Sequence, residues 1–521
     1  MLTQGKAITI PSPSPKEEKA SRTRFNRSLI MAVVMVGPFM ALLDGSVINV
    51  ALPAIMTTFG VNIDQVKWVA TAFMLATAVG MPLTGWLGRR IGLGRTYLLE
   101  MAVFTSGMAL AALSWNLNVL VFARVVEGIG AGSLMPTSLA IVTSIYPAEE
   151  RGKAIGIWGI GFMLAPAMGP TLGGILTDWF DWRAIFAVNL PLAFVAMLVA
   201  SITLDPGKPD PKLPFDFKGY LSLVIFLVAG LLTLEQGNEL GWVEPSILMG
   251  IGLSSAGLLV FIALAVDEPH PILPLRLFRN LDFSLAIWLG MTRATGLFGT
   301  LFLLPIFLQT VQARDPFHAG LLMIPAPLAV AATMPVAGIL TDRFGPRWLC
   351  VAGVALVSWS LYLYSSLDPL SSGWDVIWPQ IPRGMGMGLM NTPVSTTAMN
   401  AVRKEDTGAA SWIVTITRML TASVVIALVG TLLPSLARNE RDRLGTADVL
   451  REAPPAALMY RSLELGHGGG DTVRAAQGVL LRRVNLMANT LAFQRIHVGL
   501  SLLILSGLIP ALLITGNRRE A

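Results

Sequence analysis

The stretch LIMAVVMVGPFMALLDGSVINVALPAIM, residues 29–56, decides the class of fold to which this chain belongs. Its only charged residue is Asp44, and the residues around that acid are apolar or small. About 20 consecutive apolar residues are enough for a helix to cross the hydrocarbon core of a bilayer. The stretch therefore predicts a membrane-spanning helix that carries one ionisable side chain near its middle.

The composition of the whole chain agrees with a membrane protein. Of the 521 residues, 54% are hydrophobic and 13% are charged, and the mean hydropathy is +0.65. Soluble domains carry about 25% charged residues. The net charge of +6 comes from basic residues scattered in short loops, a distribution that favours topology signals over a nucleic-acid surface. The single cysteine, Cys350, excludes an intramolecular disulfide and a cysteine-rich metal site.

Apolar segments recur along the chain, and they predict an all-α polytopic membrane protein with 14 transmembrane helices. An even number of spans puts both termini on one side, and the excess of Lys and Arg in alternate loops predicts that this side is the cytoplasm. We therefore expect a multi-pass protein of the inner (cytoplasmic) membrane. The segments cover residues 29–56, 65–87, 96–114, 118–144, 153–177, 184–204, 219–236, 246–266, 282–305, 317–340, 348–366, 374–400, 407–434 and 494–515.

A weak repeat divides these segments into two halves. GWLGRRIGLGR, residues 85–95, follows the second span, and GILTDRFGPR, residues 338–347, follows the tenth. Related short loops in two halves are typical of a duplicated transporter bundle. The expected parts are a disordered cytoplasmic tail rather than a cleaved signal peptide (1–28), an N-terminal six-helix bundle (29–204), an inserted helix pair formed by spans seven and eight with flanking cytoplasmic loops (205–280), a C-terminal six-helix bundle (281–516) that includes an external segment (435–493), and a cytoplasmic tail (517–521).

Ionisable residues within the predicted spans are functional candidates, because burying one in lipid costs about 3 kcal/mol even on modest scales. Asp44, Arg124 and Glu127 are such residues, and we predict that they couple transport to protons. Arg293, Arg383 and Arg418 in spans nine, twelve and thirteen are further ones. The four histidines lie in loops or near span ends, so a proton relay through the membrane would need carboxylates. Two plainer interpretations stay open: Arg124 and Glu127, three positions apart, only neutralise each other, and Asp44 only bonds a neighbouring helix.

Glycines and prolines mark span five, which reads GIGFMLAPAMGPTLGGIL from residue 159. Gly161, Gly169 and Gly173 recur at multiples of four and predict a small-residue stripe for close helix approach. Pro170 removes a helical hydrogen bond and predicts a bend. Stripe and proline together suggest a helix that rocks against a partner, whereas packing alone is the plainer interpretation.

The two short loop motifs also have two interpretations. Their glycines permit tight connections between antiparallel helices, and their arginines meet anionic lipid and hold the orientation of the chain. The sharper alternative is a latch that gates the transport path. The candidate residues are Gly85, Arg89, Arg90, Gly92 and Arg95 in the first loop and Gly338, Asp342, Arg343, Gly345 and Arg347 in the second.

These motifs resemble those of a known family. LLDGSVINVALP (42–53), the 85–95 loop, RVVEGIGAG (124–132) and GPTLGG (169–174) are similar to signatures of the major facilitator superfamily, and more narrowly of its fourteen-span drug:proton antiporters of the EmrB/QacA type. Two positions depart from the family pattern. Gly88 stands where the loop motif usually has an acid, and Glu127 stands where the span-four motif usually has glutamine.

The resemblance implies the major facilitator fold, with two six-helix bundles and two inserted helices. It implies a secondary active multidrug exporter of amphiphilic, hydrophobic compounds that exchanges them for protons by alternating access. A dedicated exporter of a single metabolite, siderophore, lipid or antibiotic by the same antiport is the alternative. The resemblance implies no enzyme activity and no cofactor beyond the proton gradient, and no Walker-type stretch indicates ATP use.

Partners and substrate contacts are expected from the same resemblance. A Gram-negative relative of this type pairs with a periplasmic HlyD/EmrA-type adaptor and a TolC-like outer-membrane channel, so segment 435–493 is a candidate adaptor contact. Its stretch RAAQGVLLRRVNLMANTLAF (474–493) could form an amphipathic helix; a floppy or membrane-surface loop is the alternative. Flexible and aromatic side chains suit promiscuous apolar cavities. The candidate cavity residues are Asn49, Met40, Met135, Met163, Phe298, Arg383 and Arg418. We expect no metal site and no nucleic-acid partner.

Overall fold

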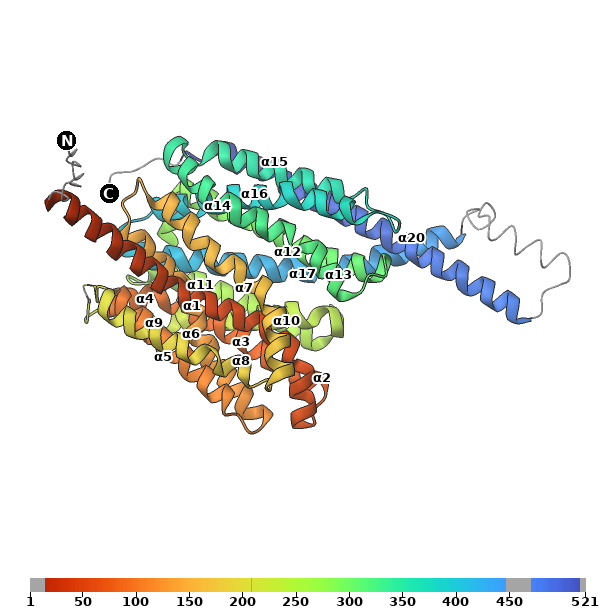
Figure 1. The fold of residues 1–521 in the computed structure, drawn as a ribbon, viewed down its shortest axis with the longest axis horizontal. Helices are drawn as coiled ribbons and strands as arrows, with labels where there is room; N and C mark the ends of the chain where they lie inside the picture. The colour runs from red at the N-terminus through yellow and green to blue at the C-terminus, as the bar shows by residue number, and fades with distance from the viewer. Residues whose placement is uncertain (1–14, 208, 447–469, 516–521) are drawn as a thin grey trace, which may run out of the picture.

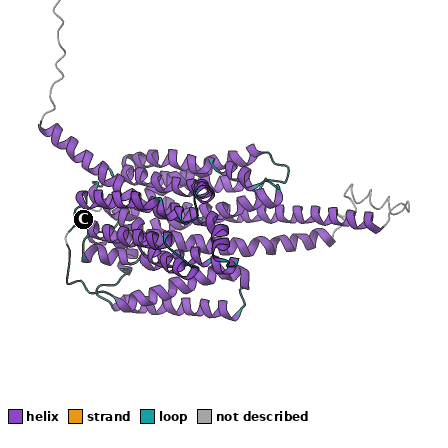
Figure 2. Cartoon of the chain, turned by 60° about the horizontal axis from the view of Figure 1, so that its bottom comes forward, coloured by secondary structure: helices purple, strands orange, loops and turns teal. Residues whose placement is uncertain are grey.

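The structure is a computed structural model that describes residues 15–207, 209–446 and 470–515. Helices account for nearly all of this part of the chain, and no strand occurs in it (Figures 1 and 2). The N-terminal half consists of α1 (Pro15–Phe59), α2 (Ile63–Val66), α3 (Trp68–Gly80), α4 (Leu83–Arg90), α5 (Leu93–Ala112), α6 (Leu117–Ile145), α7 (Arg151–Trp179), α8 (Ala184–Ala187) and α9 (Asn189–Thr203).

The remaining helices follow the linker after α9. An inserted pair comes first, and the C-terminal half follows it. These helices are α10 (Phe217–Leu240), α11 (Pro245–Asp267), the 3₁₀ turn η1 (Leu275–Arg279), α12 (Leu281–Ile306), the π-helical turn η2 (Phe307–Val311), α13 (Pro316–Met323), α14 (Pro325–Phe344), α15 (Arg347–Tyr364), α16 (Gly373–Asn400), the 3₁₀ turn η3 (Lys404–Asp406), α17 (Thr407–Thr446), α20 (Gly470–Leu505) and α21 (Leu508–Leu513).

Each of the predicted spans coincides with one helix or with a run of helices separated by a short break. In the described residues, 10 helices are long and apolar enough to cross a membrane, and the α2–α4 run, bent by 48°, makes an eleventh candidate. The helices α5, α7 and α16 fall outside this hydropathy criterion. The chain is therefore a multi-pass membrane protein, and the count of 14 spans stays a prediction.

The first helix begins earlier than the sequence predicts. α1 starts at Pro15, inside the predicted disordered tail of residues 1–28. Residues 16–27 include Lys, Glu, Ala and Arg, which are good helix formers, and proline suits the first position of a helix. Residues 1–14 and the predicted tail after residue 516 lie outside the described residues.

The predicted external segment, residues 435–493, is helical in its described parts, including the stretch 474–493 expected as an amphipathic helix. α17 continues to Thr446, and α20 already begins at Gly470, so the described parts of the segment are extensions of two helices; residues 447–469 lie outside the described part. Figure 1 shows α20 projecting well beyond the other helices. An ion pair from Arg495 of α20 to the buried Glu440 of α17 holds the two extensions together.

Close helix packing in each half depends on small residues. α6 packs against both α3 and α5. A side-chain carbon added to Gly132 of α6 would collide with the backbone of Thr77 in α3, and one added to Gly130 would collide with the backbone of Phe104 in α5. In membranes, such small residues let helices approach closely enough to pack. They therefore fix α6 in the interior of the N-terminal half.

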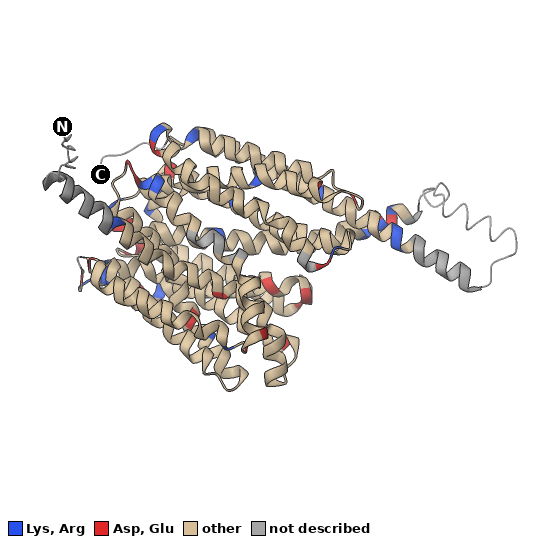
Figure 3. Ribbon diagram, viewed as in Figure 1, with Lys and Arg blue, Asp and Glu red and all other residues tan. Residues whose placement is uncertain are grey.

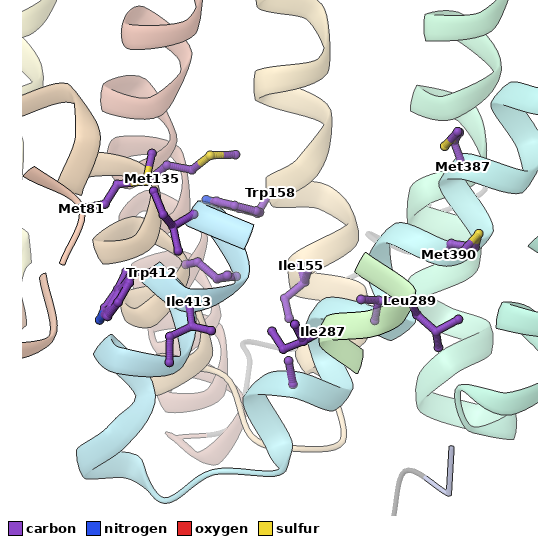
Figure 4. Close-up of a cluster of buried hydrophobic side chains, with 14 of the residues drawn as sticks. Met81, Met135, Ile155, Trp158, Ile287, Leu289, Met387, Met390, Trp412 and Ile413 are labelled. Carbon is purple, nitrogen blue, oxygen red and sulfur yellow. The ribbon is translucent and has the colours of Figure 1, made fainter. Parts of the chain in front are cut away.

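The inserted helix α10 bridges the two halves on one flank of the molecule. Thr71 of α3 donates a hydrogen bond to Glu235 of α10 at 2.6 Å. On its other side, α10 carries Asn238, whose amide oxygen accepts a hydrogen bond from Thr431 of α17 at 2.5 Å. The two halves also share one large hydrophobic core cluster. Figure 4 shows part of it, with Met135 and Trp158 from the N-terminal half and Trp412 and Met390 from the C-terminal half.

Candidate functional site

A buried ionic cluster lies in the N-terminal half, where α1 meets α6. Arg124 donates through Nη1 to Oδ2 of Asp44 at 2.5 Å and to Oε2 of Glu127 at 2.8 Å. Its Nε donates to the backbone carbonyl of Val69 in α3 at 3.1 Å. The side chains of Asp44, Arg124 and Glu127 are all 0% exposed. The structure therefore brings together the three residues that the sequence singled out as coupling candidates.

Small residues of the neighbouring helices hold this cluster in place. Gly128, next to Glu127, sits so close to α3 that an added side-chain carbon would collide with the backbone of Phe73. On α7, Gly169 and Gly173 press in the same way against Ser46 and Val47 of α1, which follow Asp44 by a few residues. The glycines of span five thus fix the height and rotation of α1 at its acid.

Part of the span-five motif contributes nothing to this contact or cannot be assigned to it. Gly174 has no other group within 4 Å of an added side-chain carbon. Gly161, Met163 and Pro170 lie at positions of α7 whose side chains are outside the described part of the structure.

The charges of the cluster do not balance when both acids are ionised. One guanidinium then faces two carboxylates, which leaves a net charge of −1 at a site without solvent. Among the described residues, Oδ1 of Asp44, Oε1 of Glu127 and Nη2 of Arg124 have no hydrogen-bond partner, although the guanidinium lies 4.1 Å from the centre of the Phe73 ring. Unpaired buried polar atoms are costly. The arrangement is therefore suited to taking up a proton and rearranging its hydrogen bonds.

A further buried acid, Glu100 of α5, escaped the sequence analysis. Its side chain is 4% exposed, and Oε1 accepts a hydrogen bond from Thr137 of α6 at 2.7 Å. Among the described residues no basic side chain forms an ion pair with it. Its position inside the predicted span 96–114 was the signal that could have revealed it, by the same rule that selected Asp44.

The second loop motif joins the two halves. Oδ1 and Oδ2 of Asp342, near the end of α14, accept the backbone N–H groups of Gly152 and Lys153 at the start of α7, each at 2.9 Å. Gly152 and Gly338 also touch so closely that an added side-chain carbon on either would collide with the other's helix. We call the end of the molecule that holds residues 85–95 and 338–347 the motif end. The two halves are in contact there.

The other residues of the second motif lie around this contact. Arg343, Gly345 and Asp342 line a pocket of about 170 Å³ at the motif end. Gly345 has a φ of +81°, a backbone conformation that favours glycine and that ends α14. Arg347 donates through Nε to the backbone carbonyl of Ile514 at 3.2 Å.

The first loop motif packs mainly on the linker between α9 and α10. Arg90 donates to the carbonyl of Leu213 at 3.1 Å, and the carbonyl of Arg89 accepts the N–H of Asp210 at 3.0 Å. Gly92 has a φ of +90°, and Arg95 is exposed. Gly85 reaches the other half, against the backbone of α17 at Ala409, and the partly buried Arg89 lies near enough to Asp406 of that half for their charges to interact. The two loop copies therefore make different contacts, and only the second places an acid between the halves.

The candidate cavity residues are dispersed. Met40 and Met135 belong to the buried core, Phe298 is partly buried, and Asn49 is exposed with its amide bonded to the carbonyl of Gly45 in the same helix. Arg383 is buried in the C-terminal half near Tyr364 and His497. Among these candidates the structure joins one pair across the halves: Nη2 of Arg418 in α17 lies 2.9 Å from the sulfur of Met135 in α6. Figure 3 shows how few charged residues occupy the middle of the helices.

Comparisons with known proteins agree on one family. Residues 34–426 match the sequence profile described as Major Facilitator Superfamily. The multidrug resistance protein Stp of Mycobacterium tuberculosis (strain H37Rv) is 32% identical over 411 residues, which cover 78% of this chain and 76% of that protein. The multidrug export protein EmrB of Escherichia coli K12 is 28% identical over 88% of this chain and 89% of its own length. The riboflavin transporter RibZ of Clostridioides difficile is 32% identical over 73% of this chain and 82% of its own length.

Solved structures show the same fold. The human organic anion transporter MFSD10 aligns with a TM-score of 0.59 and 15% identity over 92% of this chain and 99% of its own. The proton:xylose symporter XylE aligns with a TM-score of 0.57 and 14% identity over 93% of this chain and 96% of its own. Identities this low establish the arrangement of the helices and nothing about the compounds that are carried.

Proposed function

The chain belongs to the Major Facilitator Superfamily, and from this premise we propose that it is a secondary active exporter that exchanges small amphiphilic compounds for protons by alternating access. It is a multi-pass membrane transporter and not an enzyme. We place it in the inner (cytoplasmic) membrane with both termini and the motif end facing the cytoplasm, since the loops there carry most of the Lys and Arg. Its energy source is the proton gradient.

The observation that carries the proposal is the Nη1 atom of Arg124, which both Asp44 and Glu127 share without access to solvent. When one of the two carboxylates takes up a proton, the net charge of the cluster changes from −1 to zero, and one charge-assisted hydrogen bond weakens. Such bonds are about twice as strong as neutral ones. Proton binding therefore changes how tightly α1 is held to α6.

A continuous set of contacts connects this change to the motif end. α1 carries Asp44 and packs through Ser46 and Val47 on the glycines of α7. The same helix α7 begins at the motif end, where Asp342 of α14 caps it. A shift of α1 is thus transmitted through α7 to the contact between the halves. Protonation of the cluster is thereby coupled to opening of the motif end.

Relatives named for multidrug resistance support a broad substrate range. A dedicated exporter of one metabolite is the second candidate, because another relative of similar identity is named a riboflavin transporter. A panel of dissimilar compounds separates the two. Export of several unrelated amphiphiles supports the multidrug function, and export of one compound alone supports the second candidate.

The projecting ends of α17 and α20 support a partner at the opposite end of the molecule. These extensions stand beyond the other helices (Figure 1) and are joined by the Glu440–Arg495 ion pair. If the host is Gram-negative, they are positioned for an HlyD/EmrA-type periplasmic adaptor that leads to a TolC-like channel.

Inside-out vesicles that contain the chain test the exchange directly. When their lumen is acidified, export appears as uptake of a fluorescent amphiphile, and each uptake phase is accompanied by a rise in luminal pH. Uptake that persists after the gradient is collapsed, or uptake without any rise in luminal pH, would overturn proton antiport. Vesicles with an empty vector provide the background.

A further inference from the structure

One buried and one partly buried arginine of the C-terminal half have no role in the proton cluster. Arg293 of α12 is 6% exposed, and Arg418 of α17 is partly buried. Their helices α12 and α17 pack against each other, and the two positive charges are near enough to interact electrostatically. No Asp or Glu occurs in residues 283–314 around the first or in residues 407–439 around the second. The middle parts of α12 and α17 therefore carry positive charge without an acid in the same stretch of helix.

Of the two arginines, Arg293 gives the stronger indication of a ligand-binding site. Among the described residues no acidic side chain forms an ion pair with it, and no hydrogen bond reaches its Nε atom. Arg124 in the N-terminal half has two carboxylates for one guanidinium, whereas Arg293 has another cation as its charged neighbour. A buried cation without an anion is costly, so a chain that keeps one has a use for it.

The two arginines lie at one depth in the molecule, and Arg418 contacts the N-terminal half. Arg293 and Arg418 are each about three helical turns from the motif-end starts of α12 and α17. Met135, which Arg418 contacts at 2.9 Å, is about three turns from the motif-end terminus of α6. The proton cluster at Arg124 is about six turns from that terminus. The arginine pair is thus separate from the cluster and nearer the motif end.

The surroundings supply an apolar wall beside the two charges. Met135 lies with Met81, Trp158 and Ile413 in the core cluster shared by the two halves (Figure 4). A guanidinium presents a planar fork of donors that matches carboxylate, sulfonate and phosphate groups. Fixed positive charge in a medium of low dielectric attracts an anion and repels a cation more strongly than in water.

We propose that Arg293 and Arg418 bind the negatively charged group of the transported compound, so that the substrates are amphiphilic organic anions with an apolar ring or chain next to a carboxylate, sulfonate or phosphate. This inference rests on the proposed function and names the substrate class of the same transport path. Cationic amphiphiles are poor substrates, because they meet two like charges at this site.

Binding of a matched series of probes tests the inference without requiring transport. The full chain in phosphatidylcholine nanodiscs is titrated with 1-pyrenebutyrate, with 1-pyrenebutanol and with the corresponding trimethylammonium compound. We expect the carboxylate to bind most tightly. Arg293→Gln weakens carboxylate binding about tenfold and leaves alcohol binding unchanged, because one charge-assisted interaction is lost. Arg293→Lys restores part of the affinity, and Arg279→Gln, at an exposed arginine, changes nothing.

Other outcomes overturn the inference. Equal affinity of the unmodified protein for the carboxylate and the alcohol would overturn it. Equal weakening of the binding of both probes in Arg293→Gln would also overturn it, since that result points to a structural role. If Arg293→Gln does not fold, Arg418→Gln and competition in the unmodified protein decide: octanesulfonate displaces pyrenebutyrate and octanol does not. Loss of pyrenebutyrate binding on adding phosphatidylglycerol assigns the pair to lipid headgroups and also overturns the substrate assignment.

The inference and the proposed function fail separately. Proton-driven export of the cationic probe, without binding of the anion, leaves the exporter intact and removes the anion site. Selective binding of the anion, without any gradient-driven uptake in vesicles, does the reverse.

Discussion

Asp342 of α14 accepts the backbone N–H of Gly152 in α7 at 2.9 Å, and these two residues come from opposite halves of the chain. The carboxylate satisfies a donor that the first turn of a helix leaves free, and its negative charge faces the positive end of the helix dipole. When the two loop motifs are aligned on Gly85 and Gly338, the position that matches Asp342 is Arg89, directly after Gly88, and its guanidinium cannot accept an N–H group. Of the two loop motifs, only the second therefore contributes a carboxylate to the contact between the halves at the motif end.

Removal of this carboxylate should weaken closure of the motif end. In Asp342→Ala the start of α7 loses two hydrogen-bond acceptors from the other half, so the open state gains population. A cysteine at Ala148, which lines the motif-end pocket, reports the change through faster maleimide labelling; the only natural cysteine, Cys350, is buried and stays silent. Asp178→Ala, at an exposed acid of α7, serves as the control. Equal labelling rates in both variants would refute the gating role.

The two acids of the proton cluster should be needed for uphill transport and not for folding. Asp44→Asn and Glu127→Gln each leave Arg124 paired with one carboxylate, but remove one protonatable group. We expect loss of gradient-driven export, while exchange of substrate across a membrane without a gradient continues. Glu100→Gln, a buried acid without a basic partner among the described residues, should keep full coupling. Coupling that survives in Asp44→Asn contradicts the proposal.

Stability should respond differently to the two charges of the cluster. Arg124→Gln leaves two buried carboxylates without a cation and should lower the free energy of unfolding by about 3–5 kcal/mol. Asp44→Asn should change it by about 1 kcal/mol or less, since asparagine still offers an oxygen to Arg124. Thermal unfolding of both proteins in the same detergent measures the difference. Equal destabilisation would show that the arginine is not the centre of the cluster.

The glycines of α7 should be required for its contact with α1. In Gly169→Val the new side chain collides with Ser46, and overpacking of this kind costs about 1–3 kcal/mol. Gly174→Val is the matched control on the same helix, because an added carbon there meets nothing within 4 Å. Unfolding temperatures that fall equally in both variants would mean that valine is merely unfavourable in this helix.

Several features of the protein follow from local properties of the chain. The length of each apolar run predicts a span, because the thickness of the bilayer is fixed. The cost of burying a charge marks Asp44, Arg124 and Glu127 as functional candidates wherever their helices lie. These arguments do not depend on which helices lie next to each other in space. The observed helices lie where the apolar runs predict them, and the three charged side chains are buried. The same rule applied evenly would also have selected Glu100.

Other features depend on which helices meet, and the sequence by itself does not contain that information in readable form. Arg124 and Asp44 are 80 positions apart, and Asp342 and Gly152 are 190 apart. In segment 435–493 the sequence suggests an amphipathic helix over 474–493 or a surface loop, but it does not show that Glu440 pairs with Arg495 of α20 and so joins two long helices. The sequence determined the spans and their rare charges, since lipid acts on each segment separately. Tertiary packing alone decided which charge faces which, since an ion pair depends on the distance between helices.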